Sequence, residues 1–273
     1  MKTVVIDNVE LRLAHPDKLS VQWIGQKDLL KQLIAAWLVV DEKDIPLNPR
    51  LLGKPGVGKT TLAYAAAEAI GREAYIFQAT MDTRPEDLIV TPVISSGGEI
   101  AYCASSLVTA MITGGVCILD EGNRMSEKSW ASIAPLLDFR RYVESIIAGI
   151  KIQAHPGFRF VTTMNEDVST YEIPEYIHSR LQPQIKIDFP EWEEEFQILK
   201  FNLPFSNDEL LNLVVNFLQN AHAADRPYTV RDGIHIARYI LKMEKQKAKG
   251  EYNDQMVELA VEQILGEEAL DYL

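Results

Sequence analysis

The residues with the clearest chemical meaning lie in one short run, Gly53–Thr60, which reads GKPGVGKT. This run has the spacing G-x-x-x-x-G-K-[ST], in which glycines let backbone N–H groups turn inward around phosphate groups. The lysine of such a run reaches the outer phosphates, and the hydroxyl that follows it binds Mg²⁺. We therefore predict a nucleotide site formed by Gly53, Pro55, Gly56, Val57, Gly58, Lys59, Thr60 and Thr61, with Thr60 as a Mg²⁺ ligand.

A second candidate is the acidic pair Asp120-Glu121, which follows the apolar run 116–119 (VCIL). An unbroken apolar run predicts a strand buried on both faces. The carboxyl end of such a strand lies beside the phosphate-binding turn of a parallel sheet. Asp120 would then hold Mg²⁺, and Glu121 would orient or deprotonate an attacking water. A solvent-facing acidic pair is the alternative, and Gln78 and Thr80 are candidates for holding Glu121 in an inactive position.

The elements that must position these residues alternate along the chain. Short apolar runs at 50–52, 74–77, 116–119, 159–163 and 184–187 are separated by helical patterns, which predicts a parallel sheet with helices on both faces. Segments 91–102 and 142–152 each carry Gly between apolar stretches and are expected to form hairpins. Beyond residue 190 only helical spacing remains. We expect a lead-in with one helix at 1–48, a phosphate-binding (P-loop) α/β domain at 49–190 and a small all-α domain at 191–273.

Composition narrows the classes of partner. The formal net charge is −12, with 39 Asp and Glu against 27 Lys and Arg, which disfavours nucleic acid or an anionic membrane surface as the partner. No apolar run is long enough to span a bilayer, and the charged first residues do not read as a signal peptide. Two cysteines, Cys103 and Cys117, fit a reducing cytoplasm. The five histidines show no ligand spacing, so we expect no metal besides Mg²⁺.

Taken together, GKPGVGKT and CILDE resemble the Walker A and Walker B motifs of AAA+ ATPases. Residues 160–165 (FVTTMN) resemble the sensor 1 strand, which makes Asn165 the polar residue near the γ-phosphate. Residues 173–181 resemble the segment that ends in an arginine finger, Arg180. Residues 228–232 resemble sensor 2, with Arg231, and Ile24-Gly25 resemble the lining of the adenine pocket. The resemblance implies ATP and Mg²⁺ as ligands, an α/β core followed by a helical lid, and a homo-oligomeric ring, expected to be a hexamer, in which Arg180 reaches a neighbour's site.

A narrower resemblance is to the MoxR-like and midasin- and dynein-related group, which carries a helix 2 insert. Residues 120–124 (DEGNR), the stretch 86–111 and the hairpin near 142–152 correspond to features of that group. The chain departs from the pattern at Gly122, where an apolar residue is usual, and after Asp87-Leu88, where a Gly is usual.

The arginines and Asn165 have other possible roles. Arg180 would instead pair with Glu175 or end a solvated helix, and Arg231 would pair with Asp232 or Glu244. Asn165 would instead cap a strand. Three further arginines are candidates for contacts between subunits or for structural roles: Arg124, Arg140 and Arg141.

At the level of function, the resemblance implies that ATP hydrolysis remodels or activates a separate client or adaptor protein, or inserts a cofactor or metal into it. In some relatives this partner carries a von Willebrand factor A domain. The alternative is an NTPase motor of a nucleic-acid-processing or defence system. A third hypothesis is a nucleotide-gated scaffold with negligible turnover, which the presence of Glu121 and Arg180 disfavours.

Overall fold

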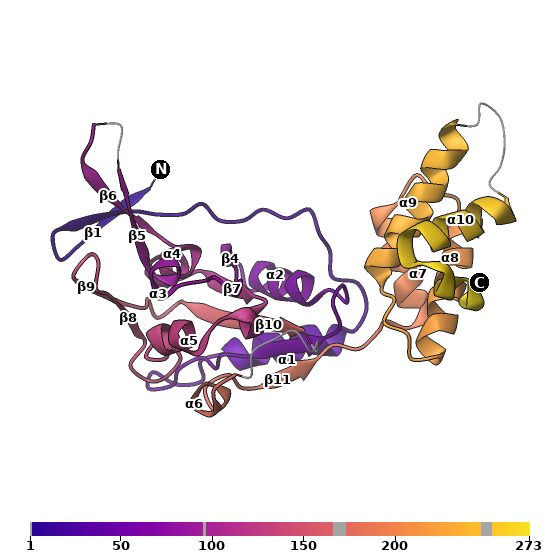
Figure 1. Cartoon of the computed structure of the whole chain (residues 1–273). Helices are drawn as coiled ribbons and strands as arrows, with labels where there is room; N and C mark the ends of the chain where they lie inside the picture. Colours follow the sequence, from indigo (N-terminus) through magenta and orange to yellow (C-terminus); the bar gives the residue numbers. More distant parts are fainter. Residues whose placement is uncertain (1, 95–96, 166–172, 247–252) are drawn as a thin grey trace. The chain divides into compact units, whose positions relative to one another are not determined.

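The computed structural model describes residues 2–94, 97–165, 173–246 and 253–273, which form two compact units (Figure 1). The first unit comprises Met1–Trp23, Lys27–Gly53 and Lys59–Ile187. The second comprises Ile24–Gln26, Lys54–Gly58 and Asp188–Leu273. The chain therefore passes between the units at the phosphate-binding run.

A five-stranded parallel sheet forms the centre of the first unit. Its strands lie in the order β11 (Gln184–Lys186), β3 (Arg50–Gly53), β10 (Arg159–Asn165), β7 (Val116–Asp120) and β4 (Ala74–Gln78). The flanking helices include α1 (Lys27–Trp37), α2 (Lys59–Ala69), α4 (Ser106–Thr113) and α5 (Glu127–Ile133). The predicted α/β class with a helical C-terminal region is confirmed.

The central strands are apolar because both faces of the sheet are covered. Val116, Cys117, Ile118 and Leu119 are completely buried, and burial raises the pKa of the Cys117 thiol. All seven residues of β10 are buried as well. An apolar run without alternation therefore marks the strand that ends in the acidic pair.

A second, four-stranded sheet includes the predicted hairpin of β5 (Val90–Ile94) and β6 (Ile100–Ala104). Ser95 and Ser96 of its turn lie outside the described residues. The other two strands, β1 (Thr3–Ile6) and β2 (Val9–Arg12), form an antiparallel hairpin in the stretch expected to be a lead-in, and β2 pairs in parallel with β6. Asp7 and Asn8 form the turn, with φ values of 48° and 65°. Asp and Asn are residue types that tolerate positive φ in a tight hairpin turn, so this dipeptide was a signal in the sequence for β1 and β2.

The remaining elements of the first unit are short. The hairpin predicted at 142–152 is present as β8 (Tyr142–Ser145) paired with β9 (Ile150–Gln153). Three further helical turns are α3 (Pro85–Leu88), η1 (Gly122–Arg124) and α6 (Glu175–His178). Among the described residues no helix is both long and apolar enough to cross a membrane.

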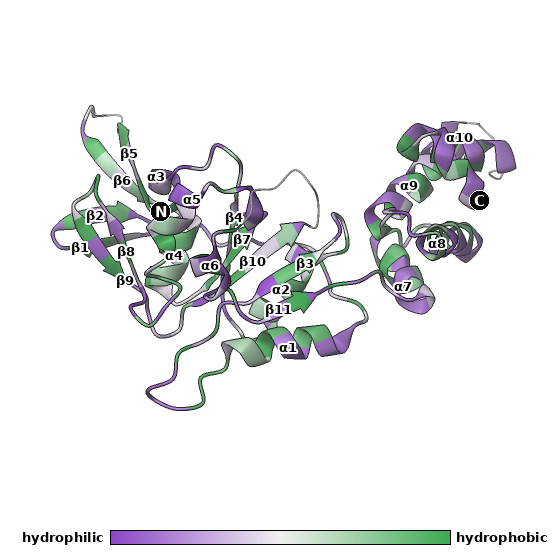
Figure 2. Ribbon diagram, turned by 60° about the horizontal axis from the view of Figure 1, so that its bottom comes forward, coloured by the Kyte–Doolittle hydropathy of each residue, from purple (hydrophilic) through white to green (hydrophobic). Residues whose placement is uncertain are grey.

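The second unit is built mainly of helices: α7 (Trp192–Asn202), α8 (Asp208–Ala223), α9 (Val230–Gln246), α10 (Asp254–Leu265) and the 3-10 helix η2 (Glu267–Tyr272). Asn207 and Asn253 cap α8 and α10 by accepting backbone N–H groups of their first turns. Figure 2 shows that each helix carries both hydrophilic and hydrophobic residues. Their apolar faces form a separate core that includes Leu210, Val214 and Ile236.

Candidate active site

The carboxyl ends of neighbouring strands bring the predicted residues of the first unit together. In the parallel register, Asn165 of β10 lies beside Gly53 of β3, and Asp120 of β7 lies beside Gln78 of β4. β3 ends at Gly53 and α2 begins at Lys59, so the phosphate-binding run joins a strand to a helix as predicted. Chain segments more than 100 residues apart therefore meet at one edge of the sheet.

Thr60 and Asp120, the predicted metal ligands, are in direct contact. Thr60 Oγ1 donates a hydrogen bond to Asp120 Oδ1 at 2.7 Å. Thr163 Oγ1 donates to the same oxygen at 2.5 Å and accepts the N–H of Glu121 at 3.0 Å. Hydroxyl and carboxylate oxygens are the donors that Mg²⁺ prefers, so this pair fits the ion. Thr163 was not predicted as a site residue, although it lies in the strand segment that resembles sensor 1.

Lys59 lies at the start of α2 and is 7% exposed. Its ammonium group donates a hydrogen bond to the backbone oxygen of Gly53 at 2.8 Å. Burying a lysine at a helix N-terminus costs free energy unless its charge is compensated by an anion or by hydrogen bonds, because desolvation disfavours the charged form. Lys59 is therefore held at the helix end where an anion is favoured.

Glu121 is held by Arg124 and Asn165 rather than by Gln78 or Thr80. Arg124 Nε lies 2.7 Å from Glu121 Oε2, an ion pair in which the N–H is not aligned as a hydrogen bond. Asn165 Nδ2 donates to Glu121 Oε1 at 3.3 Å. In this structure the side-chain partners of Glu121 are therefore Arg124 and Asn165, and the alternative position held by Gln78 or Thr80 stays a prediction. The backbone of Glu121 also has a φ of 56°, a left-handed conformation that residues other than glycine rarely adopt and that often occurs at functional sites.

Gly122 is explained by its neighbours. A Cβ atom at this position would lie 2.3 Å from Thr162 Oγ1 and 3.1 Å from a ring carbon of Trp130. Thr162 is completely buried and donates its hydroxyl to the backbone oxygen of Leu119 at 2.9 Å. Gly122 replaces the usual apolar residue because Thr162, on the adjacent strand, occupies the space that a larger side chain would need.

Arg180 is held by Asp138 and not by Glu175. Arg180 Nε donates to Asp138 Oδ2 at 3.4 Å, and Arg180 Nη1 donates to the backbone oxygen of Tyr176. Arg140 binds the same carboxylate at 2.8 Å. Hydrogen bonds from Arg140, and then from Arg180, lower the pKa of Asp138 to about 2, against a smaller opposing effect of burial. Asp138 is therefore ionised at any physiological pH.

The other arginine candidates have different surroundings. Arg141 is 8% exposed and donates to the backbone oxygen of Phe158 at 3.0 Å, and burial lowers its pKa to about 10. These contacts favour a structural role for Arg141. Arg124 pairs with Glu121, and Arg140 pairs with Asp138 on the surface of the first unit.

The remaining predicted residues belong to the second unit. Gly25 has φ of 76°, and a Cβ there would lie 2.3 Å from the Glu194 carboxyl carbon. The Glu194 carboxylate accepts the N–H of the neighbouring Gln26 at 2.7 Å. Gly56 has φ of 89°, and a Cβ there would lie 2.5 Å from Thr229 Oγ1. Both positions of the chain therefore require glycine for conformation and for space.

Arg231 lies in the first turn of α9 and is exposed. Its neighbour Asp232 accepts hydrogen bonds from the Thr229 N–H at 2.7 Å and hydroxyl at 2.9 Å. Within the part of the chain that the structure describes, Arg231 forms no ion pair with Asp232 or Glu244. Among the described residues of this unit, the Arg231 guanidinium group therefore has no ion-pair partner.

Comparisons with known proteins agree with this geometry. The model of a family described as AAA domain (dynein-related subfamily) matches residues 50–181. An uncharacterised protein of Staphylococcus aureus strain NCTC 8325 is 22% identical over 205 residues, which cover 73% of this chain and 78% of that protein.

Solved structures share the fold at low identity. The RuvB Holliday junction branch migration motor of Thermotoga maritima has a TM-score of 0.58 and 17% identity, with 88% of this chain and 70% of that chain covered. A putative ATPase from Cytophaga hutchinsonii has a TM-score of 0.53 and 17% identity, with 89% and 82% covered. NtrX of Brucella abortus, in complex with ADP, has a TM-score of 0.58 and 13% identity, with 86% and 54% covered.

The matched family region contains the strand, loop and helix of the phosphate-binding run, the acidic pair and the strand that ends at Asn165. These are the elements whose carboxyl edge gathers Lys59, Thr60, Asp120 and Glu121. Residues 50–181 are therefore similar to the AAA domain of the dynein-related subfamily, and they contain the residues of the candidate ATPase centre.

Proposed function

We propose that this chain is a MoxR-like ATPase of the helix 2 insert group. It would hydrolyse ATP with Mg²⁺ to remodel or activate a separate partner protein, or to insert a cofactor or metal into that partner. The observation that supports the ATPase centre is the hydrogen-bonded cluster of Thr60, Asp120 and Thr163, with Glu121 joined to it through its backbone N–H. An oxygen cluster beside a buried lysine is suited to a metal-bound triphosphate.

The proposed roles follow from charge. Phosphoryl transfer spreads negative charge over the transferred group, which positive groups must neutralise. Lys59 would contact the outer phosphates, and Thr60 and Asp120 would hold Mg²⁺, whose charge when bound stabilises the same oxygens. Glu121 would take the proton of the attacking water, for which it must leave Arg124, and Asn165 would orient that water. The loop residues Gly53, Pro55, Gly56, Val57, Gly58 and Thr61 would bind phosphates through backbone groups, and Ile24 and Gly25 would line the adenine pocket.

Two arginines would complete the centre. Arg231 is exposed in its unit and would contact the γ-phosphate. Arg180 is anchored to Asp138 and would reach the site of a neighbouring subunit, so that hydrolysis requires a ring, expected to be a hexamer. The chain would work in the cytoplasm, without a membrane or nucleic acid as partner.

The paired hairpins support assignment to the insert-bearing group. Ile94 and Ile100 at the end of the β5–β6 pair are 81% and 67% exposed, and Ile146 after β8 is 94% exposed. Exposed apolar side chains at hairpin ends are a means of gripping another protein. We propose that these hairpins contact the client, or an adaptor with a von Willebrand factor A domain.

The first experiment is steady-state ATP hydrolysis with Mg²⁺ at increasing protein concentration, for the wild type and Glu121→Gln. We expect specific activity to rise with concentration and the substitution to abolish it while ATP binding persists, because only the base is lost. Activity that does not change with concentration would contradict the shared-site mechanism. Strong stimulation by DNA would instead support a nucleic-acid motor.

A further inference from the structure

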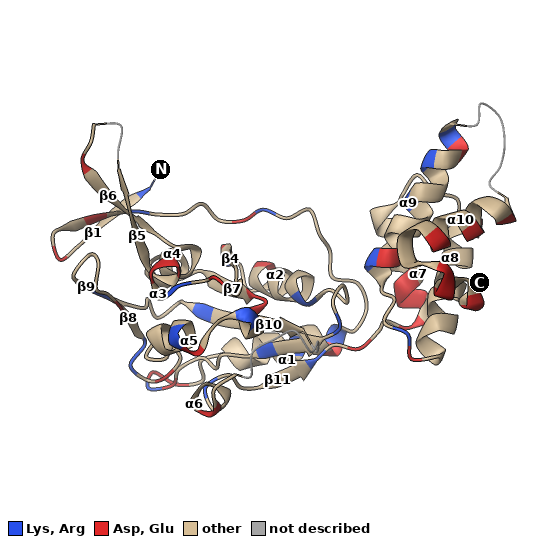
Figure 3. Ribbon diagram, viewed as in Figure 1, with Lys and Arg blue, Asp and Glu red and all other residues tan. Residues whose placement is uncertain are grey.

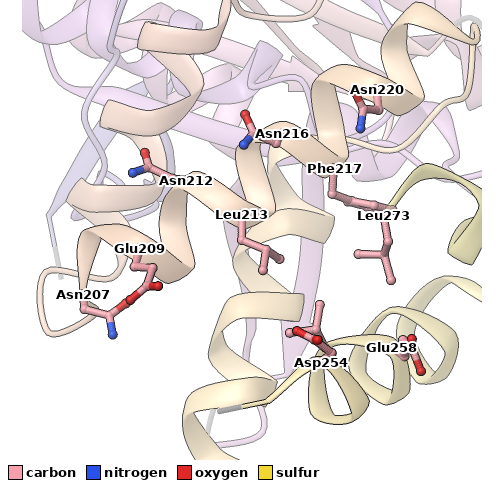
Figure 4. Close-up of a pocket in the computed structure, with 11 residues that line it drawn as sticks. Asn207, Glu209, Asn212, Leu213, Asn216, Phe217, Asn220, Asp254, Glu258 and Leu273 are labelled. Atoms are coloured by element: carbon pink, nitrogen blue, oxygen red, sulfur yellow. The ribbon is translucent and has the colours of Figure 1, made fainter. Parts of the chain in front are cut away.

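The helical unit contains a groove of about 790 Å³ between α8 and α10. Its floor is partly apolar, with Leu213, Phe217 and Val257, and its walls are polar. Figure 4 shows Asn212, Asn216 and Asn220 in a row along α8, and Asp254 and Glu258 on the other side of Leu213 and Phe217. None of these residues belongs to the ATPase centre, so the groove is a separate feature.

We propose that this groove binds an extended peptide segment that carries Lys or Arg at alternate positions. The first argument is spacing. The three asparagines are four residues apart on α8, so each step along the helix is about 6 Å. Two residues of an extended chain rise by about 6.6 Å, so successive asparagines meet the backbone of every second peptide residue.

The second argument is the hydrogen-bonding capacity of the asparagines. Asn216 Oδ1 accepts the Trp192 Nε1–H at 2.9 Å, which orients the amide and leaves its N–H₂ group as a donor. Asn220 Nδ2 donates to the backbone oxygen of Tyr272 at 3.2 Å, which leaves its oxygen as an acceptor. Asn212 makes no side-chain hydrogen bond within the described ranges. A peptide backbone offers the matching C=O and N–H groups.

The third argument is charge. Glu209, Asp254 and Glu258 line the groove, and none of them forms an ion pair with another described residue. Residues 188–273 carry about twice as many acidic as basic side chains, and Figure 3 shows acidic positions on the helices around the groove. Side chains of an extended peptide alternate in direction, so every second one faces the same wall. Cationic side chains at those positions would neutralise the carboxylates.

The test uses the whole chain and a fluorescent peptide of alternating lysine and serine, about twelve residues long, with binding followed by anisotropy. We expect saturable binding that weakens as salt rises from about 50 to about 200 mM, because exposed charge pairs are screened. A peptide of alternating glutamate and serine should not bind. A lysine–serine peptide with N-methylated serines should bind more weakly, because it keeps the charge and loses alternate N–H groups.

The variants separate the two kinds of contact. Asp254→Asn with Glu258→Gln should weaken binding about three- to tenfold, whereas Glu42→Gln with Glu68→Gln removes the same charge elsewhere and should not. Asn212→Ala should weaken binding about fivefold, as the loss of a hydrogen bond does. Equal binding by the groove variant and its charge-matched control would overturn the proposal, as would no saturable binding by the wild type at about 1 mM peptide. Undiminished binding of the N-methylated peptide would also overturn it.

Discussion

One oxygen of Asp120 accepts two threonine hydroxyls, and the second threonine also fixes the backbone of Glu121. At the scale of single residues, Thr163 therefore sets the position of both acidic groups. Because the hydroxyls of Thr60 and Thr163 both donate to Asp120 Oδ1, the Asp120 carboxylate is already oriented without a bound ligand. Groups of this kind, one step behind the metal ligands, commonly change activity by about 10- to 100-fold when they are lost.

Thr163→Val should lower kcat for ATP about 10- to 100-fold, because it removes the donor to Asp120 and the acceptor of the Glu121 N–H while keeping the shape. Hydrolysis at saturating ATP measures the effect, and binding of a fluorescent ATP analogue shows whether the nucleotide still enters. Thr163→Ser is the matched control and should keep most of the activity. Wild-type kcat in the valine variant would contradict this role.

Gly122→Ala should destabilise the first unit by about 1 to 3 kcal/mol, because the new Cβ would overlap Thr162 Oγ1. Adding Thr162→Ala to Gly122→Ala should recover part of that loss, because the clashing hydroxyl is then absent. Denaturant unfolding of the two single variants and the double variant gives the coupling energy. Strict additivity of the two losses would show that the contact between Gly122 and Thr162 is not responsible.

At the scale of elements, α7 carries an unusual buried acid. Glu195 is completely buried, and its Oε2 accepts a hydrogen bond from Gln219 of α8 at 2.8 Å. Its other carboxylate oxygen has no hydrogen-bond partner. Burial raises the pKa of Glu195 from 4.5 to about 7, against a smaller opposing effect of Gln219.

This shift gives the helical unit a stability that depends on pH. Because the folded-state pKa lies above the unfolded value, the folded unit binds the proton more tightly between pH 4.5 and 7. The stabilisation is complete below the unfolded pKa and is lost as pH rises through about 7. Glu195→Gln should remove this loss, which amounts to about 3 kcal/mol.

The melting temperature of the helical unit, followed from pH 5 to pH 8, is the measurement. We expect the wild type to fall relative to Glu195→Gln over this range, and Glu193→Gln, at an exposed position of the same helix, to behave as the wild type. Burial lowers the pKa of His222, which acts in the opposite direction, but His222 is present in all three proteins. Parallel curves for wild type and Glu195→Gln would rule out this role of Glu195.

At the scale of the whole molecule, the proposed ring makes each site depend on two chains. Arg180→Ala and Glu121→Gln should each be inactive alone. In randomly mixed rings, about a quarter of the sites should combine an intact Glu121 from one chain with an intact Arg180 from its neighbour, and these sites should hydrolyse ATP. The measurement is ATPase activity of mixtures whose mixed assembly is verified by sedimentation. Mixed rings without activity would show that Arg180 does not act between subunits.

How much the sequence predicts depends on how local each interaction is. The run 53–60 and the acidic pair could be predicted because each consists of consecutive residues with a characteristic spacing. The apolar run 116–119 predicted its strand because both faces of the sheet are covered there. The strands β1 and β2 were missed because each has only four residues and because β2 joins them to a sheet through β6, about 90 residues further along the chain.

The sequence by itself determined the α/β class and the two hairpins, and it singled out Lys59, Thr60, Asp120 and Glu121, which the structure brings to one edge of the sheet. Only the tertiary structure decided that Thr163 orients Asp120, that Arg124 holds Glu121 and that Asp138 anchors Arg180. The physical reason is that a motif records interactions along the chain, whereas these contacts depend on how side chains from separate strands and loops pack and on what burial does to each charge.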